Sequence, residues 1–174
     1  MPRKPRVIAG QAILPGVGRL AKKRTDTPGQ KRGTPEADEQ AALIRWARLW
    51  GAEGNRHRIP ALAVLLAVPN GGYYLSPAAA GKLKAAGLLA GTWDMFLPVP
   101  VTSSGGTWHL CGCWIEMKSA RGSLSPEQKR FQSAVGIQYD WFVCHTWHAA
   151  ARALLEYLGI PRTHPAWSGL EVAG

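Results

Sequence analysis

Residues 111–132, CGCWIEMKSARGSLSPEQKRFQ, decide the fold, because an apolar strand pattern runs into a charged pair and then into a helix start. Successive strand side chains alternate between faces, so Glu116 and Lys118 point one way while Ile115 and Met117 point the other. The motif by itself predicts only an ion pair on an open surface, and such a pair adds little stability. Its neighbours in the fold therefore decide what the pair does.

Apolar periodicity and helix start signals predict the other elements along the chain. The expected order is helix, strand, helix, strand hairpin, helix, strand, helix. The expected ranges are 35–51, 59–69 as a buried strand or helical start, 77–87, 93–100 paired with 107–118, 126–135, 139–144 and 146–159. This alternation predicts an α/β domain.

The positive charge is concentrated at the N-terminus. The chain has 174 residues and a net charge of +10, and residues 1–33 contain nine basic residues and one acidic residue, a net of +8. We expect residues 1–33 to be a disordered basic arm that binds polyanions nonspecifically or acts as a solubilising tail. Residues 34–160 form the expected domain and 161–174 a C-terminal tail. Without a membrane-spanning stretch or a signal-type core, the sequence favours a cytoplasmic protein.

Three cysteines and two histidines raise the question of a zinc site. The candidates are Cys111, Cys113, Cys144, His145 and His148. Their spacing, C-x-C followed by C-H-x-x-H, is neither of the usual zinc patterns. Buried free thiols and a histidine at a helix start are therefore the preferred interpretation.

A second acidic residue makes the charged pair more informative. Asp94 lies within an otherwise apolar strand, where a carboxylate is costly without a partner or a metal. The predicted hairpin places its strand beside the strand of Glu116 and Lys118. Two carboxylates with the backbone carbonyl of Met117 between them suit a hard divalent cation, and a lysine on the same face can assist an attacking water.

These residues belong to an ordered set of fragments between Pro35 and Gly159. The fragments are EADEQAALIRWA, LLAVPNGG, AAGKLKAAGLLAGTWDMFLP, WIEMKSARGSLSPEQKRF and YLG. In this order they resemble the VRR-NUC domain, the virus-type replication-repair nuclease branch of the PD-(D/E)XK superfamily. The resemblance implies a restriction-endonuclease-like fold, with a mixed central sheet flanked by helices.

The resemblance also implies roles for individual residues. Asp94, Glu116 and the Met117 carbonyl would bind Mg²⁺ or Mn²⁺, and Lys118 would be the catalytic lysine. A glutamate of the first helix would complete the site: the family's E-x-x-x-Q pattern favours Glu36, whereas the fraying of the first helical turn favours Glu39. The remaining implied residues are Gln128, assisting the lysine or DNA, and Asn70, Gly71, Gly72, Lys82 and Lys84, contacting DNA. One departure is Trp93, where the family commonly has proline.

The function implied is metal-dependent hydrolysis of phosphodiester bonds in DNA. Stand-alone members of the family are associated with homodimers that cut branched DNA such as four-way junctions, because two symmetric cuts need two sites. A flap- or end-directed nuclease of the same family and a non-catalytic DNA-binding module are the alternatives.

Overall fold

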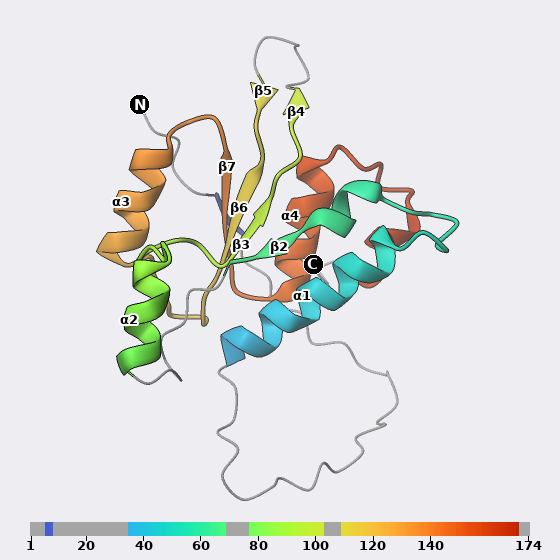
Figure 1. Ribbon diagram of the computed structural model, residues 1–174. Coiled ribbons are helices and arrows are strands. Elements are labelled where there is room, and N and C mark those ends of the chain that lie inside the picture. The colour runs from blue at the N-terminus through green and yellow to red at the C-terminus, as the bar shows by residue number, and fades with distance from the viewer. Residues whose placement is uncertain (1–5, 9–34, 69–76, 103–108, 171–174) are drawn as a thin grey trace, which may run out of the picture.

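A five-stranded mixed sheet forms the centre of the protein, as the computed structural model shows over residues 6–8, 35–68, 77–102 and 109–170 (Figure 1). The strands, in spatial order, are β1 (Arg6–Ile8), β7 (Asp140–Cys144), β6 (Cys113–Met117), β3 (Met95–Leu97) and β2 (Leu66–Ala67). β1, β7 and β6 are parallel, whereas β3 is antiparallel to both β6 and β2. The predicted mixed central sheet is confirmed.

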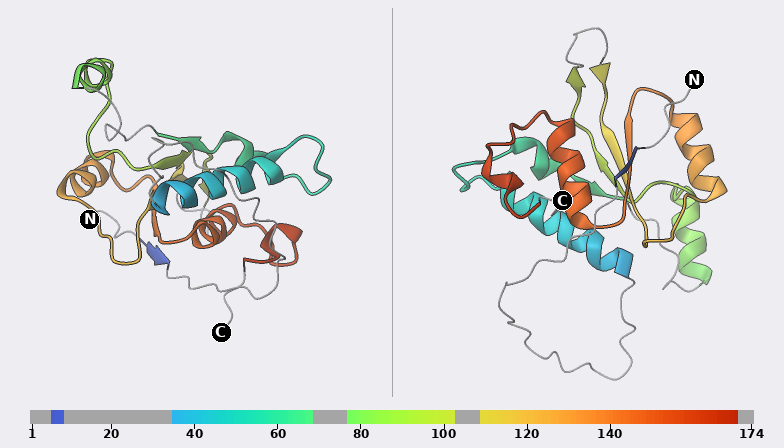
Figure 2. Two further views of the ribbon diagram at one scale, coloured as in Figure 1. Left: turned by 90° about the horizontal axis from the view of Figure 1, so that it is seen from below. Right: turned by 180° about the vertical axis from the view of Figure 1, so that it is seen from behind.

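Helices cover both faces of this sheet (Figure 2). Helices α1 (Pro35–Gly51) and α4 (Trp147–Tyr157) pack on one face, and α3 (Pro126–Val135) packs on the other. Helix α2 (Pro77–Ala85) stands apart from the other helices in the view from below. The expected order of elements is therefore confirmed for these four helices.

The alternation of side chains divides the core between the two faces. Ile115 and Met117 of β6 enter the larger core beneath α1 and α4. Trp141 and Val143 of β7 form a smaller core with Trp93 on the side of α3. Glu116 and Lys118 alternate with Ile115 and Met117, so they lie on the α3 side of the sheet, where the smaller core leaves room for polar groups.

Capping residues define the start of two helices. Ser125 accepts a hydrogen bond from the Gln128 backbone, and the Gln128 side chain accepts one from the Ser125 backbone, which together form a capping box. Thr146 caps α4 by accepting from Ala149 N. The predicted range of α3, from Pro126 to Val135, matches the structure.

The segment 59–69, expected to be a buried strand or a helical start, begins with the helical alternative and continues into a short edge strand. Residues Pro60–Val64 form the 3₁₀-helix η1, and only Leu66–Ala67 pair with β3, as β2. Pro60 suits the first turn of a helix because it has no N–H to satisfy. Burial of Leu62 and Leu65 then requires helical rather than alternating spacing, and Leu66 at the sheet edge is 49% exposed.

The long predicted strand at 107–118 is divided in two. Strand β5 (His109–Leu110) pairs with β4 (Val101–Thr102) in a ribbon that projects from the sheet, and β6 begins only at Cys113. Gly112 lies between them, and a Cβ there would come within 2.6 Å of Leu97 O. The glycine therefore permits the backbone at Gly112 to approach the backbone of β3 closely, where the ribbon joins the sheet.

Both ends of the expected domain extend further than predicted. Arg6–Ile8, which we expected to be disordered, forms β1 and pairs in parallel with β7, so that prediction is wrong for these three residues. Residues 161–174 were expected to be a tail, yet Trp167 and Leu170 are buried in the larger core and Pro165–Trp167 form the 3₁₀-helix η2. Residues 1–5, 9–34 and 171–174 lie outside the described residues.

None of the helices described is both long and apolar enough to cross a membrane.

Gly51 at the end of α1 provides a test of this packing. A Cβ there would lie 2.5 Å from Ala63 N and 2.7 Å from Ala63 Cα. Because these are backbone atoms, we expect Gly51→Ala to lower the free energy of unfolding by about 1–3 kcal/mol, as overpacking does. Chemical denaturation measures this, with Gly54→Ala as the control, because nothing lies within 4 Å of a Cβ at Gly54. Equal stability of the two variants would contradict the packing of α1 on η1.

Candidate active site

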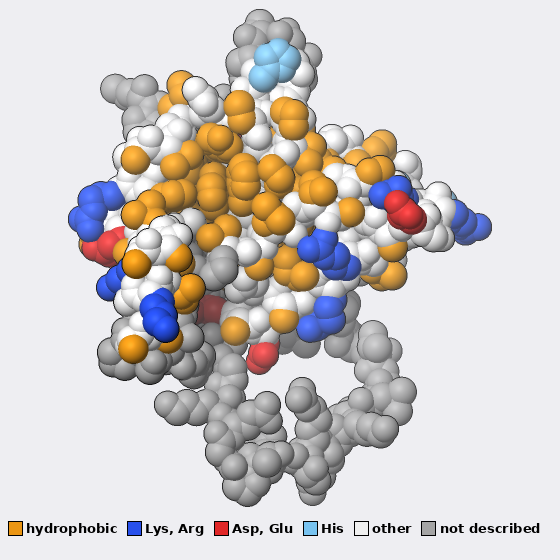
Figure 3. All heavy atoms as spheres, viewed as in Figure 1, with side chains coloured by type: hydrophobic (Ala, Val, Ile, Leu, Met, Phe, Trp, Pro, Cys, Tyr) orange, Lys and Arg blue, Asp and Glu red, His pale blue; other side chains and the backbone are white. Residues whose placement is uncertain are grey.

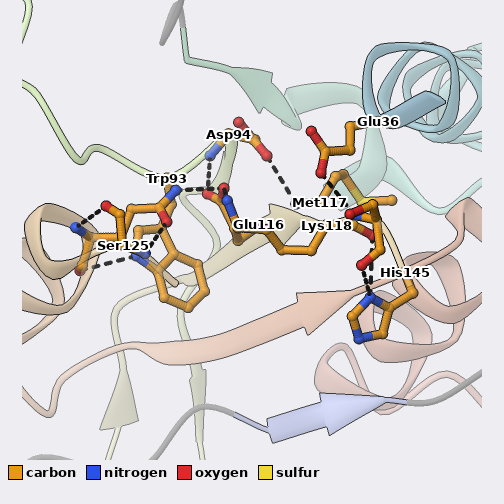
Figure 4. Close-up of polar contacts among 10 residues, drawn as sticks. Glu36, Trp93, Asp94, Glu116, Met117, Lys118, Ser125 and His145 are labelled. Carbon is orange, nitrogen blue, oxygen red and sulfur yellow. Dashed lines mark hydrogen bonds and ion pairs between the residues drawn. The ribbon is translucent and has the colours of Figure 1, made fainter. Parts of the chain in front are cut away.

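Two acidic residues lie on adjacent strands, opposite each other, where β3 begins and β6 ends. The antiparallel register pairs Met95 with Ile115, which places Asp94 opposite Glu116. Asp94 N donates to Glu116 Oε2 at 3.2 Å, and Met117 N donates to Asp94 Oδ2 at 2.8 Å (Figure 4). Each carboxylate is thus fixed by a backbone N–H of the opposite strand. The sequence prediction that the hairpin would bring Asp94 beside Glu116 is confirmed.

Glu116 is a buried charged residue, with only 2% of its surface exposed. Its Oε1 accepts from Gln128 Nε2 at 2.5 Å and lies 2.8 Å from Lys118 Nζ. Burial, followed by the nearby charge of Asp94, raises the pKa of Glu116 to about 7, while Lys118 and Gln128 act in the opposite direction. The donors of the site therefore offset only part of the cost of burying this carboxylate.

Lys118 lies immediately beyond the last residue of β6, and its side chain continues the alternation of β6 side chains between the two faces of the sheet. Its side chain is 17% exposed and points to the same face as Glu116, as the strand pattern predicts. Lys118 N donates to Cys144 O at 2.9 Å, which ties the residue to the end of β7. The ammonium group is thus held between a buried carboxylate and solvent.

Gln128 reaches Glu116 from the first turn of α3. Its Oε1 is occupied by Ser125 N in the capping box, which leaves its Nε2 to donate to Glu116. The sequence identified the capping signal and a role beside Lys118 or DNA, but not this direct contact with the carboxylate. The capping pattern fixes only the local backbone, and the side-chain target depends on where α3 packs.

The two glutamates of α1 have different partners. Glu36 Oε1 accepts from Ser119 N at 2.7 Å, next to Lys118. Glu39 Oε2 accepts from Trp147 N at 2.6 Å, at the N-terminus of α4. Of the two alternatives, Glu36 is the one that contacts the Lys118–Ser119 segment, whereas Glu39 joins two helices.

Sequence reasoning missed two contacts beside Lys118. Ser119 supplies the N–H that Glu36 accepts, and His145 Nδ1 lies 2.9 Å from Ser119 O. The sequence places His145 among the zinc candidates or at a helix start, and neither interpretation predicts this contact. No sequence signal could have found it, because the contact depends on β6 and β7 ending side by side.

The remaining predicted residues lie away from these contacts or cannot be placed. Lys82 and Lys84 are exposed on α2, where Figure 3 shows basic side chains. Asn70, Gly71 and Gly72 lie outside the described residues. The contacts of these five residues with DNA therefore stay predictions.

The cysteines do not suit zinc. Burial raises the pKa of Cys144 to about 12 and that of Cys113 well above its ordinary value, as suits free thiols in the core. Cys111, by contrast, is exposed. In the part of the chain that the structure describes, no three His, Cys, Asp or Glu side chains are grouped to hold a metal.

A hard divalent cation fits the two carboxylates better. Mg²⁺ is commonly bound by one or two carboxylates, with water and substrate phosphate completing its shell. Asp94 and Glu116 provide such a pair at the junction of β3 and β6. The two carboxylates therefore suit Mg²⁺ or Mn²⁺, and the Met117 carbonyl stays a predicted third oxygen ligand.

Comparison with known proteins supports the fold. No protein-family model matches the chain, and no curated protein matches it in sequence. One similar solved structure is a VRR_NUC domain protein, with a TM-score of 0.51 and 18% sequence identity, over 75% of this chain and 93% of that chain. At this identity the likeness concerns the fold alone, and it confirms the expected restriction-endonuclease-like α/β architecture.

The different partners of Glu36 and Glu39 can be tested through stability. Glu39→Ala leaves Trp147 N at the α4 terminus without its charged acceptor, which we expect to cost about 1.5–3 kcal/mol of unfolding free energy. Glu36→Ala should cost less, because the bond from Ser119 is exposed and water can replace the carboxylate. Denaturation measures both, with exposed Asp38→Ala in the same helical turn as the control. A larger loss for Glu36→Ala would contradict this assignment.

Proposed function

We propose that the protein is a divalent-metal-dependent nuclease that hydrolyses phosphodiester bonds in DNA. The observation that carries the proposal is the convergence of Asp94, Glu116 and Lys118 at one point of the sheet. A buried carboxylate beside a half-buried one and a lysine has no evident structural purpose, because apolar residues would stabilise such a site at least as well. The likeness in fold to a VRR_NUC domain protein supports the same function.

The residues have separable tasks in this proposal. Asp94 and Glu116, with the Met117 carbonyl, would hold Mg²⁺ or Mn²⁺, which supplies charge stabilisation at a phosphoryl oxygen when bound. Lys118, with Nζ 2.8 Å from Glu116, would orient the attacking water and stabilise the charge that develops on the phosphate. Gln128 would hold the Glu116 carboxylate in one orientation, and Glu36 would hold the backbone after Lys118.

The substrate is proposed from the resemblance and from charge. Residues 1–33 carry a net charge of +8, which suits a DNA backbone, and exposed Lys82 and Lys84 would add contacts with it. Asn70, Gly71 and Gly72 are proposed to approach a phosphate closely. A homodimer cutting branched DNA such as four-way junctions is the proposed form.

Substitution of the central residues tests the reaction. We expect Lys118→Met and Asp94→Asn each to lower Mg²⁺-dependent cleavage by at least about 10²-fold, since each removes a group that stabilises the transition state or holds the ion. Cleavage would be measured on single-stranded, duplex, flap and four-way DNA, with the cut positions mapped. Lys129→Met removes the same charge from an exposed position of α3 and serves as the matched control. Full activity of folded Lys118→Met would refute the role of this lysine.

Metal binding separates a nuclease from a DNA-binding module without measuring turnover. We expect wild-type protein to bind Mn²⁺, as measured by electron paramagnetic resonance of the free ion. Asp94→Asn should weaken the binding strongly, because one of the two carboxylates is lost, whereas Lys118→Met should retain it. Unchanged Mn²⁺ affinity in Asp94→Asn would place the ion elsewhere.

A further inference from the structure

Residues from three other parts of the chain contact the backbone of Lys118 and Ser119, just after β6. Lys118 N donates to Cys144 O at 2.9 Å, and Ser119 N donates to Glu36 Oε1 at 2.7 Å. The two carbonyls of the same dipeptide face His145, whose Nδ1 lies 3.2 Å from Lys118 O and 2.9 Å from Ser119 O (Figure 4). All four backbone polar groups of Lys118 and Ser119 therefore have partners.

The position of His145 follows from the sheet. It comes directly after β7, whose last residue, Cys144, is in register with Met117 at the end of β6. The two parallel strands thus end together, and the next residue of β7 meets the next residues of β6. Thr146 then caps α4, which fixes the backbone of this junction on its other side.

The partners of His145 determine where its ring proton lies. Both are carbonyl oxygens, which only accept hydrogen bonds, so Nδ1 must carry a hydrogen to contact them. A neutral ring then has its lone pair on Nε2. His164 provides the opposite case in the same chain, because its Nδ1 accepts from Ala166 N at 3.1 Å and must lack a hydrogen.

Lys118 needs such support because it lies beyond the paired part of β6. The strand ladder ends at Met117, and the Lys118 amide is its last contact with β7. Rotation of the peptide after Lys118 would displace the side chain from Glu116, where Nζ now lies 2.8 Å from Oε1. A donor to the carbonyls of Lys118 and Ser119 opposes this rotation.

We propose that His145 is a positioning residue, which holds the backbone of Lys118 and Ser119 through Nδ1–H and thereby keeps the lysine at the reacting centre. The proposal rests on the proposed nuclease function for its catalytic consequence. The hydrogen bond itself does not depend on that function. A contact of Nε2 with a substrate phosphate is the competing role for the same ring.

The tautomer is tested in wild-type protein without DNA or metal. Long-range ¹H–¹⁵N spectra, recorded where histidines are neutral, distinguish the nitrogen that carries hydrogen from the one that does not. We expect His145 to be protonated on Nδ1 and His164 on Nε2, with His145→Asn identifying the first signal by its loss. A His145 ring protonated on Nε2 would overturn the proposal.

Two substitutions then separate the ring nitrogens in function. His145→Asn places an amide donor near the position of Nδ1, whereas His145→Gln places it near that of Nε2. We expect His145→Asn to retain most of the activity, and His145→Gln and His145→Ala to lower kcat by on the order of 10²-fold with KM for DNA unchanged, as displacement of a catalytic group does. His109→Gln, at an exposed histidine of the β4–β5 ribbon, is the control.

The other outcomes have distinct meanings. Rescue by His145→Gln but not by His145→Asn would show that Nε2 acts, and wild-type activity in all three variants would show that the ring is dispensable; either result overturns the proposal. Wild-type protein that cleaves no DNA, yet shows His145 protonated on Nδ1, would count against the nuclease function while supporting the hydrogen bond to Lys118 and Ser119.

Discussion

The buried carboxylate of Glu116 is the constraint on which the rest of the site depends. A charged group removed from water is strongly destabilising unless other groups compensate it. Here the compensation comes from Asp94 N, Gln128 Nε2 and Lys118 Nζ, which belong to the start of β3, to α3 and to the end of β6. Burial, and after it the nearby charge of Asp94, still raises the pKa of Glu116. Asp94 and Glu116 together offer the kind of carboxylate pair that Mg²⁺ takes in proteins.

The surrounding elements each contribute a polar contact to this centre. Helix α1 provides Glu36, the capping box of α3 provides Gln128, and the junction between β7 and α4 provides His145. Glu39 supports the site indirectly, because it accepts a hydrogen bond from the first N–H of α4 and so joins α1 to α4. The site therefore depends on the relative placement of helices on both faces of the sheet, and a shift of either layer would disturb Lys118 or Glu116.

Trp93, where the sequence departs from the resembled family, is accommodated by packing and a hydrogen bond. It stands where the resembled family commonly has proline, and it is fully buried against Trp141 with ring centroids 4.8 Å apart. Its Nε1 lies 3.4 Å from Gln128 O, so it connects the chain before Asp94 to the first turn of α3. Restriction of the backbone by proline is thus replaced here by packing and a hydrogen bond, and both carboxylates keep their register.

The sequence by itself determined the four helices and the hairpin that brings Asp94 beside Glu116 and Lys118. Local signals were sufficient for α3, where Ser125, Pro126 and Gly136 define the ends, and alternation in β6 was sufficient to place Glu116 and Lys118 on one face. Only the tertiary structure gave Glu36 and Glu39 different partners, directed Gln128 to Glu116 and brought His145 to Lys118. Those contacts join residues distant in the chain, and their geometry follows from the packing of helices on the sheet, which local periodicity does not encode.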